Sequence, residues 1–254
     1  MAVRVSDNQG LYCEAAVAES MPFAVAIWFR VKTITSNHPL FWTGDKNDAN
    51  IWCDLEARGG QAGDPVRLVQ KWGPADYRDA ESEAYSAQTW HHVVGVWAST
   101  TSRSIWLDGV DTENTSESIE LAGYNRTALG ALLDATPNFE DWQELAEAAV
   151  WHRMPEPWEI QAMAGGWSPL FFLDGLKHYY PLGGRFGQNY RDIIGGYDLA
   201  DWGTAVEWVA DPPGIVYPDD PQLGQYRIQV GPYEVATGQM HVAGAAAGQF
   251  KRAG

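Results

Sequence analysis

The stretch QTWHHVVGVWASTTSRSIWLDGVD, residues 88–111, decides the fold of this chain. Along residues 90–97 a period of two places apolar side chains on both faces, which is typical of a strand in the middle of a sheet. The polar residues 98–102 separate this strand from a second apolar run, residues 103–107, so the pattern predicts a β-hairpin. The dipeptide Asp108-Gly109 tolerates positive φ at both positions, and it predicts a tight turn into a further strand.

Further strands are predicted on both sides of this hairpin. Apolar or alternating runs favour strands at residues 1–19, 23–33, 38–43, 51–55, 66–72, 119–121, 127–133, 142–152, 176–182 and 198–209. Residues 75–88 show no regular period, and we expect a loop there. Only residues 155–164 have helical features, because Glu156 and Glu159 favour the positive N-terminal end of a helix and Gly165-Gly166 ends it.

Composition and charge restrict the classes of function. The chain has 254 residues, of which 45% are hydrophobic and 20% charged, as in a folded protein with a buried core. Its net charge of −16 disfavours nucleic acid as a partner, because the phosphate backbone is also negative. No run approaches the ~18 consecutive apolar residues of a membrane-spanning helix, so we expect no membrane insertion.

The N-terminal sequence indicates synthesis in a cytoplasm. Residues 1–20 lack a basic start followed by an apolar run, so we expect no secretory signal. In such a compartment Cys13 and Cys53 are expected to be two buried thiols, with a single disulfide as the alternative. Their spacing offers no zinc site.

The hairpin also carries a resemblance to a known family. TWHHVVGVW, residues 89–97, followed by SIWLDGV, residues 104–110, resembles the signature of laminin-G-like domains, which belong to the concanavalin A-like lectin/glucanase superfamily. FAVAIWFR at residues 23–30 and ELAEAAVW at 144–151 resemble further strands of that family, and PEPWEI at 155–160 resembles its short helix. The resemblance implies an all-β, antiparallel two-sheet jelly-roll sandwich, and the alternating periods agree with it.

Enzymatic chemistry has little support in the sequence. Glucanases of the superfamily use carboxylates in a Glu-x-Asp-x-x-Glu spacing on one strand, and this string is absent. The nearest acids, Asp141, Glu144 and Glu147, have a spacing of three that suits a helix better than a strand. The Gly-x-Ser-x-Gly motif of serine hydrolases is absent too. His91 and His92 point to opposite faces of a strand, so they do not share a metal. We therefore expect a protein that is not an enzyme.

Two loop regions supply candidate binding residues. Calcium prefers hard oxygen ligands, and the best local cluster is the loop 44–50, with Asp45, Asp48 and Asn50 as candidate ligands. A solvated hairpin tip is the alternative, and calcium is the only cofactor that the sequence points to. Aromatic rings near predicted loops form a candidate glycan site, namely Trp42, Trp52, Trp72 and Tyr77. Five other tryptophans of the predicted strands are expected in the core: Trp28, Trp90, Trp97, Trp106 and Trp151.

A more specific resemblance concerns biological context. AEAAVW at residues 146–151, PEPWEI at 155–160, GWSP at 166–169, YYPL at 179–182 and DPPGI at 211–215 look similar to accessory virion proteins of tailed bacteriophages. The resemblance implies a capsid decoration protein or tail-attached module located in the virion, with glycans as a further ligand. The alternatives are a carbohydrate-binding or adhesion domain of a cellular protein, and a glycoside hydrolase.

The end of the sequence differs in composition from the rest. We expect a laminin-G-like jelly-roll domain over residues 1–217 and an extended C-terminal arm over residues 218–254. Residues 221–254 have a charge of +2, against −18 for residues 1–220. An arm opposite in sign to the body is suited to bind a neighbouring molecule, so other virion proteins or further copies of this chain are the expected partners. A mobile tail is the alternative.

Overall fold

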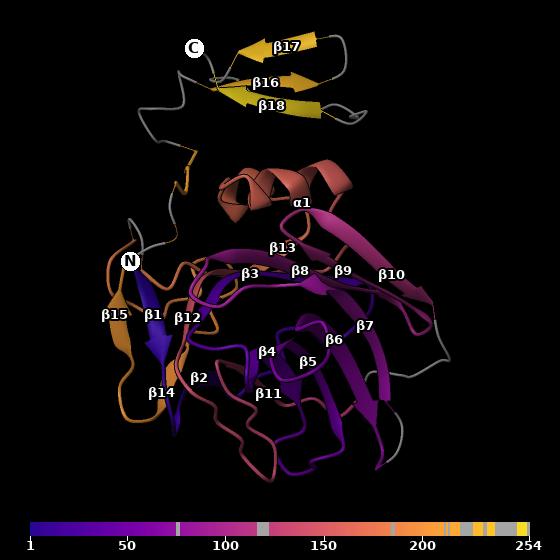
Figure 1. Cartoon of the computed structure of the whole chain (residues 1–254), viewed down its shortest axis with the longest axis vertical. Helices are drawn as coiled ribbons and strands as arrows, with labels where there is room; N and C mark the ends of the chain where they lie inside the picture. The colour runs from indigo at the N-terminus through magenta and orange to yellow at the C-terminus, as the bar shows by residue number, and fades with distance from the viewer. Residues whose placement is uncertain are drawn as a thin grey trace.

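The computed structural model is an antiparallel sandwich of two large sheets, with one short helix on the outside (Figure 1). The described residues are 1–74, 77–115, 122–183, 186–210, 212, 214–218, 226–230, 233–236 and 248–252.

Sheet A contains the predicted hairpin. Its strands are, in order, β10 (Val110–Thr115), β9 (Ser102–Leu107), β8 (His91–Ser99), β3 (Phe23–Val31), β12 (Gln143–Trp151), β1 (Ala2–Val5) and β15 (Glu207–Val209), and β13 (Leu176–Tyr180) pairs with β12 beyond the end of β1. Val93 pairs with Leu107 and Trp97 with Arg103, as the hairpin requires. Asp108 and Gly109 have φ values of 51° and 83°, so the predicted tight turn is confirmed.

Sheet B forms the second layer. Its strands are, in order, β14 (Ala200–Gly203), β2 (Gln9–Cys13), β11 (Arg126–Leu129), β4 (Asn37–Gly44), β5 (Ile51–Arg58), β6 (Pro65–Trp72) and β7 (Tyr77–Ala84). Two predictions were wrong here. Residues 77–84 form edge strand β7, not a loop, and they lack an apolar period because Ala80 is the one buried residue of the strand. Residues 198–209 form two strands, β14 and β15, in different sheets.

The core fills the space between the two sheets. Phe23 of β3 stacks on Trp97 of β8 at 4.5 Å between ring centroids, and both side chains have no exposed surface. Each such buried side chain contributes roughly 1.5–3 kcal/mol of transfer free energy. Cys13 and Cys53 are free, buried thiols, and burial raises their pKa values to about 11 and about 12. The prediction of two thiols is confirmed.

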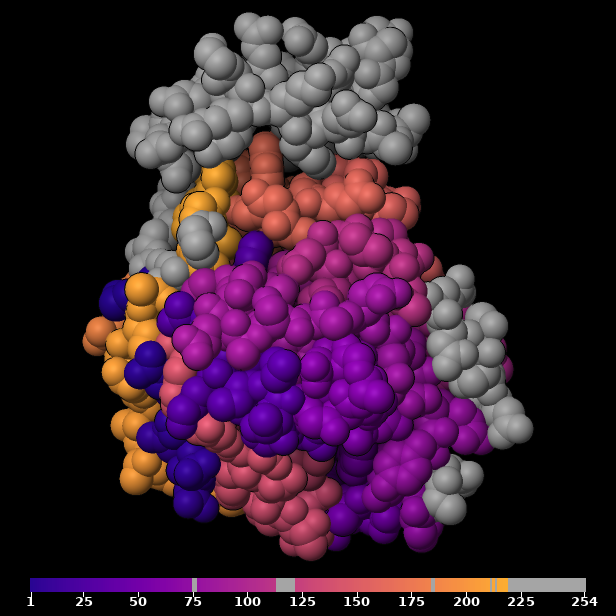
Figure 2. All heavy atoms as spheres, in the orientation of Figure 1, coloured from indigo at the N-terminus to yellow at the C-terminus, as the bar shows by residue number. Residues whose placement is uncertain are grey.

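The predicted helix is α1 (Pro157–Ala164), which is followed by the short 3-10 helix η1 (Pro169–Phe171). Helix α1 covers the outer face of sheet A, where its buried residues form one cluster with residues of β3, β8, β12 and β13 (Figure 1). Its start is fixed because the Glu159 carboxylate accepts the Glu156 backbone N–H at 2.7 Å. Figure 2 shows the α1 segment lying on the hairpin strands in the space-filling view. In the described part of the chain, no helix is long and apolar enough to cross a membrane.

The C-terminal segment contains paired β-strands, which the predicted extended arm does not include. Three of its strands, β16 (Tyr226–Val230), β17 (Tyr233–Ala236) and β18 (Gly248–Arg252), pair with one another in the order β17-β16-β18 (Figure 1). The sequence pattern predicts an extended arm here and does not predict this pairing. The domain boundary at residue 217 stays a prediction. Residues 119–121, a predicted strand, lie outside the described residues.

Candidate functional site

The outer face of sheet B, which no helix covers among the described residues, carries a band of aromatic rings across its strands. Residues paired across neighbouring strands on one face of a sheet bring their side chains together. One such row runs from β11 to β7 through Arg126, Gly44, Trp52, Lys71 and Tyr77. We call the band the outer aromatic strip and define it by five rings and two cations: Trp202, Tyr12, Trp42, Trp52, Tyr77, Arg126 and Lys71.

The first cluster of the strip is formed by Trp52, Lys71 and Tyr77. The two rings meet edge to face at 6.2 Å between centroids. Lys71 Nζ lies 5.6 Å from the Trp52 ring and 5.0 Å from the Tyr77 ring, and it donates a hydrogen bond to the Ala49 carbonyl oxygen at 3.0 Å. The Tyr77 side chain is 43% exposed. The ammonium group therefore fixes an aromatic ring that is open to solvent.

The second cluster is formed by Tyr12, Trp202 and Arg126. The rings of Tyr12 and Trp202 lie edge to face at 5.3 Å. The Arg126 guanidinium is 5.4 Å from the Tyr12 ring and 5.2 Å from the Trp202 ring. Arg126 also donates to Glu14 at 2.6 Å and to the Leu133 carbonyl oxygen at 3.1 Å. This hydrogen bond from Arg126 lowers the pKa of Glu14. Both rings are half-buried, so part of each reaches solvent.

Trp42 occupies the middle of the strip but has no exposed surface. Its ring lies over Gly44, where a Cβ atom would come within 2.7 Å of Trp42 Cζ2. Trp42 also pairs with Ala128, whose side chain is small. On its other side the indole packs in one apolar cluster with residues of the 131–139 segment, Ala131, Leu133 and Phe139 among them. Trp42 is therefore buried beneath this segment and does not present a free ring face.

The four residues predicted as a glycan site do not all lie together. Trp42, Trp52 and Tyr77 share the outer face of sheet B, whereas Trp72 pairs with Ile51 and falls on the opposite face from Lys71. The reason is the alternation of side chains along β6, because Trp72 follows directly after the outward-facing Lys71. Sequence reasoning also missed Tyr12 and Trp202, which belong to strands 187 or more residues apart in the chain and paired only in the folded sheet.

An unpartnered carboxylate lies beside the strip. Asp54 of β5 pairs across the sheet with Trp42 and Val69, and its side chain is buried at 1% exposure. Among the described residues neither Asp54 oxygen has a hydrogen-bond partner, and the Trp42 indole N–H has none either. Burial, and then the negative charge of Glu56, raise the pKa of Asp54 well above its ordinary value. The sequence signal was available, because Asp54 is an acid inside a strand of mostly buried residues.

The carboxylates of the candidate calcium loop accept hydrogen bonds from their own turns and from Asn125. Asp45 Oδ1 accepts the Asn47 backbone N–H at 2.9 Å and the Asn125 side-chain amide at 2.9 Å. Asp48 Oδ1 accepts the backbone N–H and side-chain amide of Asn50 at 2.8 and 3.0 Å. Asn50 thus directs its N–H group, not its oxygen, at Asp48. The described residues hold no group of three or more His, Cys, Asp or Glu side chains suited to a metal ion. These hydrogen bonds do not favour a calcium site at Asp45, Asp48 and Asn50, where calcium binding stays a prediction.

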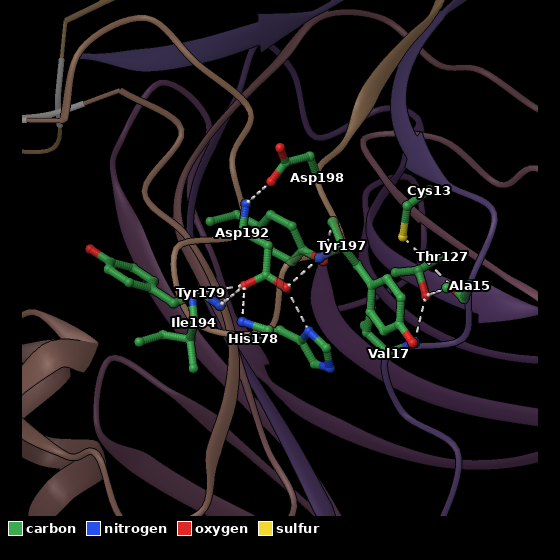
Figure 3. A network of polar contacts seen from close by, with 12 residues as sticks. Cys13, Ala15, Val17, Thr127, His178, Tyr179, Asp192, Ile194, Tyr197 and Asp198 are labelled. Carbon is green, nitrogen blue, oxygen red and sulfur yellow. Dashed lines mark hydrogen bonds and ion pairs between the residues drawn. The ribbon is translucent and has the colours of Figure 1, made fainter.

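Asp192 fixes the loop after β13 (Figure 3). Its carboxylate accepts His178 Nδ1 at 2.7 Å and the Tyr179 backbone N–H at 3.0 Å. Three more backbone N–H groups, in residues 194–197, donate to it at 2.9 to 3.2 Å. Burial on its own raises the pKa of Asp192, but these donors outweigh it and lower the pKa to about 2. The network holds the loop in place and leaves the carboxylate fully hydrogen bonded.

A serine, a histidine and an aspartate also meet at the end of the hairpin. His91 Nδ1 lies 2.7 Å from Asp108 Oδ2, and His91 Nε2 lies 3.1 Å from Ser86 Oγ. However, His91 Nε2 also accepts the Ser86 backbone N–H at 3.2 Å. Asp108 accepts the His92 backbone N–H at 2.9 Å as well. Since the histidine lone pair is shared with a backbone donor, this chain of contacts joins the 85–90 loop to the 108–109 turn.

The acids considered for hydrolysis are occupied by structural contacts. Glu144 has no exposed surface and is ion-paired with both Arg4 and Arg30. Glu147, at a bulge of β12, accepts the hydroxyl groups of Tyr179 and Tyr217 at 2.5 and 2.7 Å. Both acids lie on sheet A, away from the outer aromatic strip.

The sequence comparison identifies the family. A laminin-G-type family model, described as the concanavalin A-like lectin/glucanases superfamily, matches residues 6–161. The chain belongs to this superfamily. The matched residues include the hairpin and most of both sheets. No curated protein sequence matches the chain.

Solved structures agree with this superfamily fold. A leech intramolecular trans-sialidase has a TM-score of 0.51 at 10% identity, over 65% of this chain and 28% of that chain. The carbohydrate-binding module CBM40 of a Ruminococcus gnavus sialidase has a TM-score of 0.50 at 9% identity, over 64% of this chain and 97% of that chain. Domain 4 of the Geobacillus stearothermophilus arabinanase AbnA has a TM-score of 0.49 at 21% identity, over 61% of this chain and 72% of that chain. At these identities the likeness concerns the jelly-roll fold alone.

Proposed function

We propose that this chain is a non-enzymatic attachment protein of a virion whose jelly roll binds glycans on the outer face of sheet B. The observation that carries the glycan part is the cluster of Trp52, Lys71 and Tyr77, in which a lysine holds a ring that is 43% exposed. Exposed aromatic rings of this kind provide the flat apolar surface on which a sugar ring stacks, with hydroxyl groups left to hydrogen bond at its rim.

The superfamily and its solved relatives support the same reading. The matching family is named for lectins and glucanases, and the module from Ruminococcus gnavus is a carbohydrate-binding module by name. Fold likeness alone does not transfer a ligand, because function depends on the residues of a site. The argument therefore depends on the strip, and the relatives supply only the class of ligand to test first.

The absence of enzymatic activity is part of the proposal. A glycosidase needs two carboxyl groups flanking one glycosidic bond. Glu144 is neutralised by two arginines, and Glu147 is enclosed by tyrosine hydroxyls. A glycoside hydrolase stays the alternative, and release of reducing sugar by the purified protein, abolished by Glu144→Gln or Glu147→Gln, would support it.

The virion part is supported by the sequence likeness described above and by the opposite charges of the C-terminal segment and the body. Its test is incorporation of the full chain and of a chain lacking residues 221–254 into tailed phage particles. We expect the full chain to copurify with capsids or tails and the shortened chain to be lost, while the jelly roll keeps its melting temperature. Equal incorporation of both forms would contradict the role of the segment. A full chain that stays in the particle-free fraction would favour a cellular adhesion domain.

The glycan part is tested with a glycan array probed by three forms of the full chain. The wild type is compared with Tyr77→Ala and with Tyr197→Ala, a matched control because Tyr197 is 47% exposed and lies on the loop held by Asp192. We expect Tyr77→Ala to lose at least tenfold in affinity for any glycan the wild type selects, and Tyr197→Ala to bind as the wild type does. Equal loss in both variants would place the site elsewhere.

A further inference from the structure

Two histidine side chains lie next to each other where β12 ends and β13 begins. His152 directly follows β12, and His178 of β13 pairs with Val150 of β12. Their ring centroids are 6.3 Å apart, and the ring planes are tilted by 57°. His152 is half-buried and His178 is 7% exposed, so the pair lies close to the surface of the sandwich. Rings tilted in this way do not stack face to face, so they do not cover each other's nitrogen-bearing edges.

Asp192 fixes which nitrogen of His178 carries the hydrogen atom. Its carboxylate lies 2.7 Å from His178 Nδ1 (Figure 3), and with its pKa lowered to about 2 it is ionised at neutral pH. An ionised carboxylate only accepts hydrogen bonds, so Nδ1 donates to it. The lone pair of the neutral His178 ring is therefore on Nε2, which points away from Asp192.

The Val17 carbonyl oxygen has the same effect on His152. It lies 3.1 Å from His152 Nε2. Because a carbonyl oxygen only accepts hydrogen bonds, Nε2 carries the hydrogen atom and the lone pair of the neutral ring is on Nδ1. Among the described residues neither His178 Nε2 nor His152 Nδ1 has a hydrogen-bond partner, and neither atom is fully buried. Both lone pairs are therefore free to bind a ligand from solvent.

We propose that His152 and His178 form a binding site for a zinc ion, with His152 Nδ1 and His178 Nε2 as its ligands. Neutral imidazole nitrogens are ligands that suit zinc, nickel and copper. A histidine that binds a metal almost always donates its other N–H to a carboxylate or a backbone carbonyl, which fixes the ring and its tautomer. Here Asp192 and Val17 supply one acceptor of each kind, so both ligands are oriented before the ion binds.

The distance between the two rings fits one shared ion after a small movement. Zn–N bonds are about 2.0–2.1 Å long, so two imidazoles on a tetrahedral zinc have ring centroids roughly 5 Å apart. The observed 6.3 Å exceeds this by about 1 Å, which a rotation about the side-chain bonds of the half-buried His152 can supply. The described residues hold no group of three or more His, Cys, Asp or Glu side chains suited to a metal. Water therefore completes the coordination, and the ion is exchangeable, unlike zinc in a closed structural site.

A bound ion would join parts of the chain that are distant in sequence. His152 is hydrogen bonded to Val17, in the segment between β2 and β3, while His178 is hydrogen bonded to Asp192 of the 192–197 loop. Zinc between the two rings connects this segment with this loop. An ion that binds only the folded chain raises its melting temperature, here by roughly 5–11 °C when zinc is at a hundred times its dissociation constant.

Calorimetric titration of zinc chloride into the full chain, prepared without a histidine tag, tests this inference. The wild type is compared with His152→Gln and His178→Gln, which keep an amide donor but remove the ring nitrogen that binds the ion. His91→Gln is the matched control, because both nitrogens of His91 already have hydrogen-bond partners. We expect each of the first two variants to weaken zinc binding at least tenfold and the control to bind zinc as the wild type does.

Copper(II) added in place of zinc gives a second measurement that decides the question even if a variant does not fold. Pulsed electron paramagnetic resonance counts the imidazole rings bound to the copper ion, and we expect two in the wild type and one in either ligand variant. No zinc binding, a single bound imidazole in the wild type, or unchanged affinity in His152→Gln or His178→Gln overturns the inference. A loss of the same size in His91→Gln overturns it too, because the ion would then bind elsewhere. The glycan array is a separate measurement, so failure here leaves the proposed function standing.

Discussion

Two buried aspartates of this protein are predicted to have opposite effects on stability. Asp192 accepts five hydrogen bonds and its pKa is lowered to about 2, whereas Asp54 has no partner among the described residues and its pKa is raised. Replacing each by Asn removes the charge while keeping the size of the side chain. We expect Asp192→Asn to destabilise the protein at pH 7 and Asp54→Asn to stabilise it.

The magnitudes follow from these environments. Against an ordinary value of 3.8, a folded pKa of about 2 for Asp192 corresponds to about 2 kcal/mol of stability at neutral pH, at ~1.4 kcal/mol per pKa unit. For Asp54, leaving a buried polar group without a hydrogen-bond partner costs about 1–3 kcal/mol, and more when it is ionised, so the Asn variant, which cannot ionise, recovers part of that cost. In a chain of this size 1 kcal/mol moves the melting temperature by roughly 2–4 °C.

The pH dependence has opposite signs at the two sites. The stability that Asp192 contributes is present above the unfolded pKa near 3.8 and is lost as the pH falls through about 2. Since the folded pKa of Asp54 is raised, its ionisation destabilises the folded state as the pH rises above the unfolded value. The loss in Asp192→Asn should therefore shrink in acid, and the gain in Asp54→Asn should shrink there too.

Urea unfolding followed by tryptophan fluorescence at pH 7 and pH 3 measures both differences, and an unchanged m-value confirms that only stability has changed. The comparison of two Asp→Asn variants in one protein controls for the chemistry of the substitution. A loss of stability in Asp54→Asn at pH 7 equal to that in Asp192→Asn would refute the reasoning, because it would mean that Asp54 has a partner of comparable strength.

Three further predictions concern packing and anchoring. Gly44→Ala should destabilise the protein by about 1–3 kcal/mol, because the added methyl group would come within 2.6 Å of the Ile51 carbonyl oxygen and of Trp52 Cβ, and within 2.7 Å of Trp42 Cζ2. Calorimetry checks this, and an unchanged melting temperature would contradict the close approach. Trp97→Ala should cost about 3–5 kcal/mol in urea unfolding, since a fully buried ring stacked on Phe23 is lost; a cost under 1 kcal/mol would contradict its place in the core. Tyr217→Phe removes one hydroxyl from Glu147 and should speed proteolysis near residues 214–218, with loss of about 1–2 kcal/mol; identical cleavage rates would show that this contact does not anchor the segment.

The sequence predicts the elements whose residues are buried on both sides. Strands β8 and β12 appear where the pattern places them, because continuous burial leaves a continuous apolar run. Strand β9 follows from its alternating period, and helix α1 from its acidic first turn and the glycines that end it. Strand β7 was missed because it lies at the edge of sheet B and only Ala80 among its residues is buried. The other positions of the strand accept polar side chains. The division of residues 198–209 into two strands was missed because a short polar turn gives no sequence signal that the chain crosses from one sheet to the other.

The candidate site was predicted in part for a related reason. Proximity to loops selected Trp52 and Tyr77, and the pairing of β5, β6 and β7 brings them together around Lys71. The second cluster needs the contact between Tyr12 and Trp202, and that contact depends on the order of strands in sheet B. The tryptophans expected in the core also form two groups. Trp97 and Trp151 are fully buried, whereas three on the outer face of sheet A are half-buried, namely Trp28, Trp90 and Trp106.

The half-buried tryptophans on sheet A make it necessary to ask which sheet binds a ligand. On sheet A, α1 covers one part of the outer face. Over another part Arg30 lies 5.4 Å from the Trp90 ring, and both Arg30 and Arg4 are ion-paired with the fully buried Glu144. These contacts satisfy one another within the protein, because the buried Glu144 carboxylate is ion-paired with both arginines and each guanidinium packs on an aromatic ring. Sheet B differs, since the Tyr77 ring stays 43% exposed beside Lys71. An exposed ring held by a neighbouring cation is the physical reason to look for a ligand on sheet B first.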